Sequence, residues 1–225
     1  MWRGEGMRDE LGFRAGRMPL YPTLLAPLTS LRNGVAIAHA LQWCAGAIAA
    51  VMVATWARRW GGTVGVLAGL MVALDPFSVF TSSLILTETF FVTALIALWW
   101  ILWRAAESSC SLRDWGMVGL LAGICVYLRE SSFGLVLVGI AWTVVVQKSR
   151  ARSLCGAAFS LLIVAAMLIP WAYRNDRVLG EWGWLTTRGG ISLYDGVGPQ
   201  ADGSSDLGHV KDADVVRGLN ELERD

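Results

Sequence analysis

The sequence predicts an all-α, polytopic membrane protein with about six transmembrane helices. Of its 225 residues, 55% are apolar and 16% are charged, whereas soluble globular proteins carry roughly 45–50% apolar and about 25% charged residues. The mean hydropathy of +0.50 agrees with this class. A net charge of +1 provides no basic surface for nucleic acid. The composition therefore excludes a disordered chain and an ordinary soluble domain.

Six apolar stretches are candidates for membrane spans, since a spanning helix needs about 20 mostly apolar residues. The third is expected to start near Thr87, and the fourth and fifth are short. A proline lies near the end of the second (Pro76) and of the sixth (Pro170). The six stretches are 35–57, 63–80, 90–103, 115–128, 133–147 and 154–173.

The segments on either side of these stretches differ from them in composition. In residues 1–34, Pro19 and Pro22 argue against a regular helix, and a short apolar piece broken by Pro27 fits a re-entrant or interfacial segment. Residues 174–225 are polar and rich in glycine, which is typical of a loop region, and 213–224 has the spacing of an amphipathic helix. We therefore expect a transmembrane domain over 35–173, between two extracytoplasmic segments.

The loop charges predict the orientation. Seven Lys and Arg residues fall in the loops after the first, third and fifth stretches, whereas the opposite loops contain only Arg129. Cytoplasmic loops carry the excess of Lys and Arg. Both terminal segments, the 81–88 loop and Arg129 are then expected outside. The arginines of the first segment do not follow this rule, because they are expected outside, and they become candidates for a functional role.

Two acidic residues lie near predicted span ends, where charged groups are costly and often functional. Asp75 precedes Pro76, so it either caps the end of the second span or belongs to a site. Glu88 lies at the start of the third span, where the helix dipole favours a carboxylate. Its alternative role is to hold a divalent metal or a substrate hydroxyl at the outer face.

Three arginines are expected at the same outer face. Arg129 lies in the turn between the fourth and fifth spans, Arg174 follows the sixth span, and Arg17 precedes a proline-rich turn. Arg174 and Arg17 are each either an interfacial anchor or a ligand, and Arg129 either forms a solvated ion pair with Glu130 or binds a lipid phosphate. Guanidinium suits phosphate because it offers a planar fork of donors. Acids and arginines together on one side predict a site for a phosphate-bearing substrate at the outer leaflet.

Several motifs resemble those of one enzyme family in their order and spacing. Arg17-Met-Pro-Leu-Tyr-Pro resembles Arg/Lys-Pro-Pro-Leu-Tyr-Pro, and Asp75-Pro followed by Thr87-Glu-Thr-Phe resembles Asp-Pro then Thr-Glu-Thr-x-Phe. Tyr127-Leu-Arg, Pro170-Trp-Ala-Tyr-Arg-Asn and Thr187-Arg-Gly-Gly have counterparts as well. These are motifs of the polyprenyl-phosphate-sugar glycosyltransferases, which include dolichyl-phosphate-mannose protein mannosyltransferases and lipid A aminoarabinose transferases. The resemblance covers roughly residues 5 to 203.

This resemblance implies a partial GT-C architecture and a bacterial inner-membrane glycosyltransferase. A sugar would pass from a polyprenyl-phosphate donor in the membrane to an acceptor, which is a protein, lipid A or a glycan. The carboxylate of an acidic residue would act as general base, and arginine or lysine would bind the leaving lipid phosphate. The resemblance leaves the cofactor open, a divalent metal on Glu88 being one option. The residues predicted for catalysis are Glu88 and Asp75, and those for lipid phosphate or sugar binding are Arg17, Tyr21, Arg129, Arg174 and Asn175.

Two departures from the family pattern lead to other expectations. The family's first helix and the catalytic aspartate of its first outer loop have no counterpart here, and Asp9 and Glu10 lie too close to Arg17 to match that aspartate. The chain also stops where the family continues, so it is expected to be a fragment. The alternatives are a non-catalytic polyprenyl-phosphate-binding protein, a degenerate copy, and a small transporter, which would show paired repeats.

Overall fold

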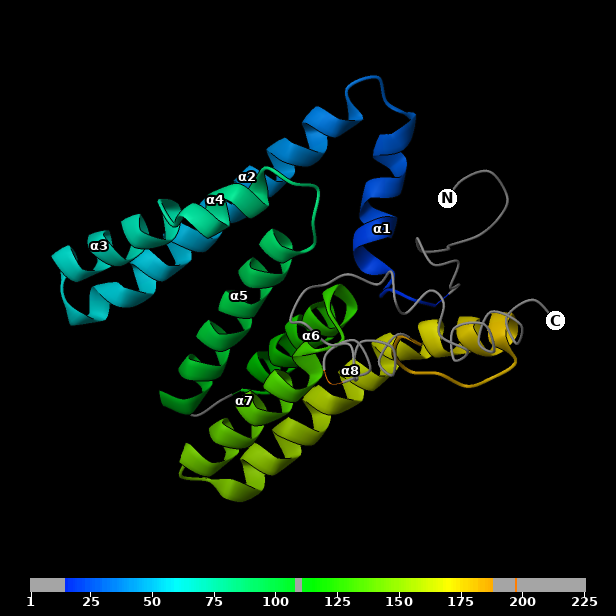
Figure 1. Cartoon of the computed structure of the whole chain (residues 1–225). Helices are drawn as coiled ribbons and strands as arrows, with labels where there is room; N and C mark the ends of the chain where they lie inside the picture. Colours follow the sequence, from blue (N-terminus) through cyan, green and yellow to red (C-terminus); the bar gives the residue numbers. More distant parts are fainter. Residues whose placement is uncertain (1–14, 108–110, 188–196, 198–225) are drawn as a thin grey trace. The chain divides into compact units, whose positions relative to one another are not determined.

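The computed structural model describes residues 15–107, 111–187 and 197, and all regular structure within them is helical (Figure 1). The predicted all-α class is therefore confirmed. The helix expected at 213–224 lies outside the described residues. The chain divides into a larger unit, Pro19–Met167, and a smaller unit formed by Met1–Met18 and Leu168–Asp225. Each unit is described by itself.

Each of the six predicted apolar stretches forms helix. The second is divided between two helices, and the last helix begins in the larger unit and ends in the smaller one. Short 3-10 helices occupy Ala26–Ser30 and Arg58–Trp60. The α-helices are α1 (Leu20–Leu25), α2 (Gly34–Ala57), α3 (Gly62–Ala73), α4 (Pro76–Ser82), α5 (Glu88–Glu107), α6 (Leu112–Leu128), α7 (Ser132–Val146) and α8 (Arg150–Leu179).

Three helices among the described residues are long and apolar enough to cross a membrane. They are α2 with its 3-10 extension, α5 and α8, and the bent pair α3–α4 makes a fourth if it counts as one span. The helices α6 and α7, with 17 and 15 residues, are shorter than the ~20 residues that a span needs. The structure thus supports three or four of the six predicted spans by length and composition.

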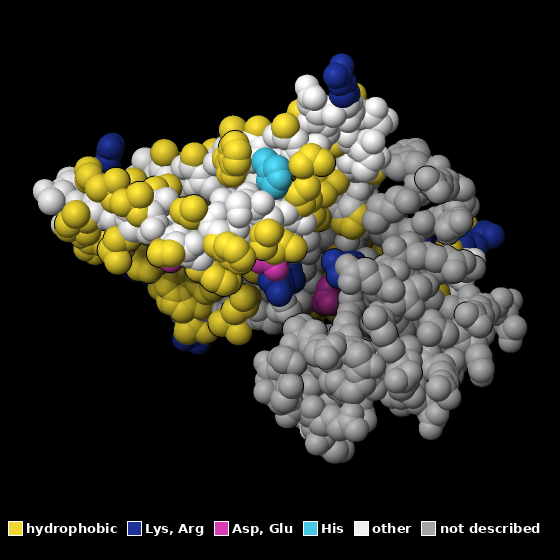
Figure 2. Space-filling view, turned by 45° about the horizontal axis from the view of Figure 1, so that its top comes forward, with side chains coloured by type: hydrophobic (Ala, Val, Ile, Leu, Met, Phe, Trp, Pro, Cys, Tyr) yellow, Lys and Arg dark blue, Asp and Glu magenta, His cyan; other side chains and the backbone are white. Residues whose placement is uncertain are grey.

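The three long helices expose most of their apolar surface. Only 28%, 17% and 33% of their most apolar windows is buried inside the protein. Figure 2 shows hydrophobic side chains spread over the face of the α2–α3–α4 region that it draws. Soluble monomers rarely expose apolar patches of more than a few hundred Å². A surface of this kind fits contact with lipid.

The N-terminal prolines do not prevent helix formation, contrary to the sequence prediction. Pro19 is the N-cap of α1, and Pro22 lies within its first turn. The first N–H groups of a helix have no intrahelical acceptor, so a proline there removes no hydrogen bond. Pro27 likewise lies at the start of a 3-10 helix.

The two other prolines act differently from each other. At Asp75-Pro76 the chain breaks between α3 and α4, which are bent by 48°. Pro170, by contrast, lies inside α8, and the helix continues to Leu179, beyond the expected end at residue 173. Neighbouring turns keep their bonds when a proline removes one. Helix α8 ends instead at Gly180, whose φ of +72° is the left-handed conformation of a helix C-terminus.

One end of the larger unit gathers the basic loops predicted to be cytoplasmic. Arg59, after α2, pairs with Glu107 at the end of α5 at 3.1 Å. Gln147, after α7, donates a side-chain hydrogen bond to the carbonyl oxygen of Ala105 in α5. These contacts place the segments after α2, α5 and α7 at the same end of the unit. The charge pattern predicts the same grouping, because it assigns these three loops to one side of the membrane. The side of the membrane that they face stays a prediction.

Candidate functional site

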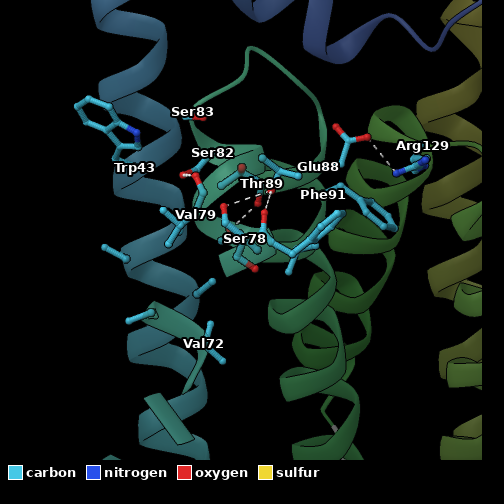
Figure 3. Close-up of a pocket in the computed structure, with 18 residues that line it drawn as sticks. Trp43, Val72, Ser78, Val79, Ser82, Ser83, Glu88, Thr89, Phe91 and Arg129 are labelled. Carbon is cyan, nitrogen blue, oxygen red and sulfur yellow. Dashed lines mark hydrogen bonds and ion pairs between the residues drawn. The ribbon is translucent and has the colours of Figure 1, made fainter. Parts of the chain in front are cut away.

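The opposite end of the larger unit holds Glu88 and Arg129. Glu88 is the first residue of α5, and Arg129 follows the last turn of α6 with an extended backbone. Arg129 Nη1 lies 3.4 Å from Glu88 Oε1, and a dashed line marks this ion pair in Figure 3. The two side chains are 48% and 30% exposed, so solutes can reach both of them. The structure therefore brings together a carboxylate and a guanidinium that the sequence analysis predicted as separate site residues.

A cavity of about 860 Å³ opens beside this pair. Its walls come from α2, from the broken α3–α4 segment and from α5 (Figure 3). Both apolar and hydroxyl side chains line it, so the cavity can take a ligand that is partly apolar and partly polar. Besides Glu88 and Arg129 its lining includes Trp43, Val72, Phe77, Ser78, Thr89 and Phe91.

Tyr21 lies close to the same pair. Its ring centroid is 6.0 Å from that of Phe90, and the side chain is buried. Its hydroxyl is buried and has no hydrogen-bond partner among the described residues. Burial, together with the negative charge of Glu88, raises the pKa of Tyr21 to about 12. The hydroxyl therefore keeps its proton at neutral pH and is a donor without an acceptor.

Asp75 has the capping geometry that was one of its two predicted roles. Its Oδ2 accepts a hydrogen bond of 2.7 Å from the backbone N–H of Ser78 and so caps α4. Asp75 is not among the residues that line the cavity, although Ser78 is. Its carboxylate thus holds the helix that forms one wall, and a direct part in catalysis stays a prediction.

The smaller unit holds the other predicted ligands. Arg174 Nη1 donates to Asn175 Oδ1 at 3.1 Å, and its guanidinium carbon lies 5.0 Å from the centroid of the Trp171 ring. Asn175 is fully buried and donates through Nδ2 to the carbonyl oxygen of Gly183 at 2.9 Å, which fixes the chain after α8. Arg17 is exposed in a non-helical segment. The predicted Thr187 motif lies mostly outside the described residues.

The part of the chain that the structure describes offers no ligand set for a metal ion. It contains no group of three or more His, Cys, Asp and Glu side chains in a metal-binding arrangement. Divalent cations with oxygen ligands are held by several carboxylates, carbonyls or waters. A metal on Glu88 would therefore have one carboxylate of the described residues as a ligand, and this metal stays a prediction.

Gln42 belongs to this end of the unit and was missed by the sequence analysis. It lies in the middle of α2 with 1% of its surface exposed. Its Nε2 donates to the carbonyl oxygens of Leu84 and Leu86, in the loop that leads to Glu88. The available signal was an amide inside a largely apolar stretch, where polar groups are costly.

These features define a helical membrane protein with a charged site at one end of its helices. Residues 17–173, more than half of the chain, match the family described as dolichyl-phosphate-mannose-protein mannosyltransferase. The chain belongs to this family, which confirms the resemblance seen in its motifs. No curated protein and no solved structure matches it. Membership indicates glycosyl transfer in a membrane from a polyprenyl-phosphate-linked sugar.

Proposed function

We propose that the chain transfers a sugar from a polyprenyl-phosphate donor to an acceptor hydroxyl at the extracytoplasmic face. The observation that carries the proposal is the Glu88–Arg129 pair at the edge of a partly apolar cavity, in a chain of this family. The Arg129 guanidinium provides a ligand for phosphate, and the Glu88 carboxylate provides a general base. The nature of the sugar and of the acceptor is left to experiment.

In this mechanism Arg129 binds the phosphate of the donor. Its planar donors match phosphate oxygens, and its exposure lets the lipid headgroup approach. A phosphate on Arg129 competes with Glu88 for the same guanidinium. Binding of the donor therefore weakens the ion pair and leaves the carboxylate of Glu88 available to a second substrate.

Glu88 then acts as the general base. The acceptor oxygen forms a bond to the anomeric carbon while its proton passes to the Glu88 carboxylate. The bond from the anomeric carbon to the phosphate oxygen breaks, and polyprenyl phosphate leaves with the electron pair. Arg129 stabilises the charge that develops on this leaving group. Tyr21 is proposed as a further sugar or phosphate ligand through its protonated hydroxyl, which is buried beside the site and has to become exposed for this contact.

The arginines and the asparagine of the smaller unit are proposed as further ligands of the lipid phosphate or sugar. Arg17 is exposed, and the Arg174 guanidinium rests on the Trp171 ring, which orients its donors. Asn175 is held by the Gly183 carbonyl, so its role in binding would be to keep Arg174 in place.

A second candidate function is binding of polyprenyl phosphate without transfer. It is favoured by the state of the two predicted acids, since Glu88 is paired with Arg129 and Asp75 is engaged by the amide of Ser78. A protein with only this function would hold the lipid phosphate and leave the sugar bond intact.

The test uses the full chain reconstituted in liposomes with polyprenyl-phosphate-mannose labelled in the sugar. Release of polyprenyl phosphate and transfer of the label support the enzyme, and tight binding without release supports the binding protein. Arg129→Ala should raise the KM for the donor severalfold or more. Arg113→Ala removes an exposed arginine at the opposite end of α6 and serves as the matched control.

A further inference from the structure

The buried amide of Gln42 connects the middle of α2 to the loop before α5. Gln42 Nε2 donates to the carbonyl oxygen of Leu84 at 2.9 Å and to that of Leu86 at 3.1 Å. One side chain thus binds two carbonyls of a loop more than 40 residues away in sequence. The amide assignment follows from chemistry, because only the NH₂ group can donate to carbonyls.

The position of Gln42 on its helix is unusual. The other buried residues of α2 are small and include Gly34, Ala38, Ala45 and Ala49. Small residues allow the backbone of neighbouring segments to approach closely. The Gln42 Oε1 atom is buried and has no partner among the described residues, which costs free energy. An apolar side chain of similar size would fill the same space without this cost. The amide is therefore explained by its hydrogen bonds to the loop and not by the space that the side chain fills.

The two hydrogen bonds act next to Glu88. Leu86 is two residues before it, and the carbonyl oxygen of the intervening Thr87 accepts the first helical bond of α5, from Phe91 N–H at 2.9 Å. Within the loop, the amide of Leu86 bonds to the carbonyl of Leu84 at 2.9 Å. Fixing these carbonyls fixes the start of α5 and with it the origin of the Glu88 side chain.

Helices α2 and α5 have an independent connection. The two helices pack against each other, and the hydroxyl of Thr93, one to two turns into α5, is shared between the carbonyl oxygens of Ala45 at 3.0 Å and Thr89 at 2.8 Å. Loss of the Gln42 amide therefore leaves the two helices joined and releases only the loop.

We propose that Gln42 is a positioning residue that holds the loop before α5 and thereby places the Glu88 carboxylate beside Arg129. Its importance for transfer rests on the proposed function of Glu88. Its effect on the loop does not, so the two can be tested apart.

The test compares the full chain with Gln42→Met, which has similar length and no donor. Ser160→Ala is the matched control, because the buried Ser160 hydroxyl ties α8 to the carbonyl oxygen of Trp115 away from this loop. Amide hydrogen exchange of residues 83–88 is measured by mass spectrometry in nanodiscs. We expect exchange about tenfold faster or more in Gln42→Met, and no change there in Ser160→Ala. Gln42→Asn, which keeps the amide but shortens its reach, replaces Gln42→Met if that variant fails to accumulate.

Transfer kinetics provide the second measurement. A misplaced Glu88 should lower kcat on the order of 100-fold with little change in the KM for the donor. Unchanged exchange of residues 83–88 in Gln42→Met, or an equal increase in Ser160→Ala, overturns the positioning role whatever the kinetics. Faster exchange confined to Gln42→Met supports it. If Glu88→Gln leaves transfer intact in the same preparation, the proposed role of Glu88 fails while the positioning of the loop stands.

Discussion

Replacement of Glu88 by glutamine separates a chemical role of this carboxylate from a structural one. The substitution keeps the size of the side chain and removes its charge. The ion pair with Arg129 has an N–O distance of 3.4 Å, and its members are 30% and 48% exposed. Solvent-exposed pairs contribute about 0–1 kcal/mol, and a carboxylate at a helix N-terminus contributes about 0.3–1 kcal/mol more. The expected loss in the free energy of unfolding is therefore under about 2 kcal/mol.

The chemical role predicts a much larger effect on rate. General-base catalysis contributes about 10²–10⁴-fold, which corresponds to about 3–5 kcal/mol of barrier at about 1.4 kcal/mol for each tenfold change. We therefore expect Glu88→Gln to lower the transfer rate by at least 100-fold while the unfolding temperature falls by less than about 8 °C. Both quantities are measured on the same reconstituted preparation.

Glu107 supplies the control for this experiment. Its carboxylate pairs with Arg59 at 3.1 Å at the other end of the larger unit, and it is also exposed. Glu107→Gln should alter stability to a similar small degree and leave transfer at the level of the unmodified chain. Transfer by Glu88→Gln at the full rate refutes the reasoning, and so does an equal loss of transfer in both variants.

Further predictions concern stability. An added Cβ at Gly156 would lie 2.2 Å from the indole of the buried Trp115, so Gly156→Ala should lower the free energy of unfolding by about 1–3 kcal/mol. The control Gly134→Ala meets no atom within 4 Å and should be neutral or slightly stabilising in detergent melts. Hydrogen bonds from Ser111 hold the pKa of Asp114 below its usual value. Because the folded pKa is depressed, this stabilisation is present above about pH 4 and is lost as the pH falls below it. Asp114→Asn should therefore destabilise by under about 1 kcal/mol at pH 7 and have a smaller effect near pH 3, while an equal effect at both pH values would contradict the capping role.

The helices were predictable because their signal is local. Apolar runs bounded by charged loops fixed the positions of α2, α5 and α7 to within a few residues. The break at Asp75-Pro76 was also predictable, since proline removes a donor and restricts the residue before it. The effects of Pro22 and Pro170 were harder to foresee, because they depend on which turn of the helix the proline occupies.

The site was predictable as a set of residue types and not as a set of contacts. Glu88 and Arg129 are 41 residues apart in sequence, and their pairing depends on how α5 packs against α6. The same holds for Gln42, whose hydrogen bonds reach the loop before α5. Side-chain partners of this kind are set by tertiary structure, and a motif contains no information about them.

The two ends of the larger unit differ in how firmly they are held. At the basic end the Arg59 guanidinium lies 5.4–5.8 Å from the centroids of three indole rings, of Trp56, Trp60 and Trp103, in addition to its ion pair with Glu107. Each cation–π contact at an exposed site is worth about 0.5–1 kcal/mol, so several contacts act on one side chain. At the other end, the described contacts of the Arg129 guanidinium include its ion pair with Glu88 at 3.4 Å and one ring, that of Phe91, at 6.0 Å. In the proposed mechanism a phosphate on Arg129 displaces Glu88, and a guanidinium with fewer ring contacts than that of Arg59 permits this exchange.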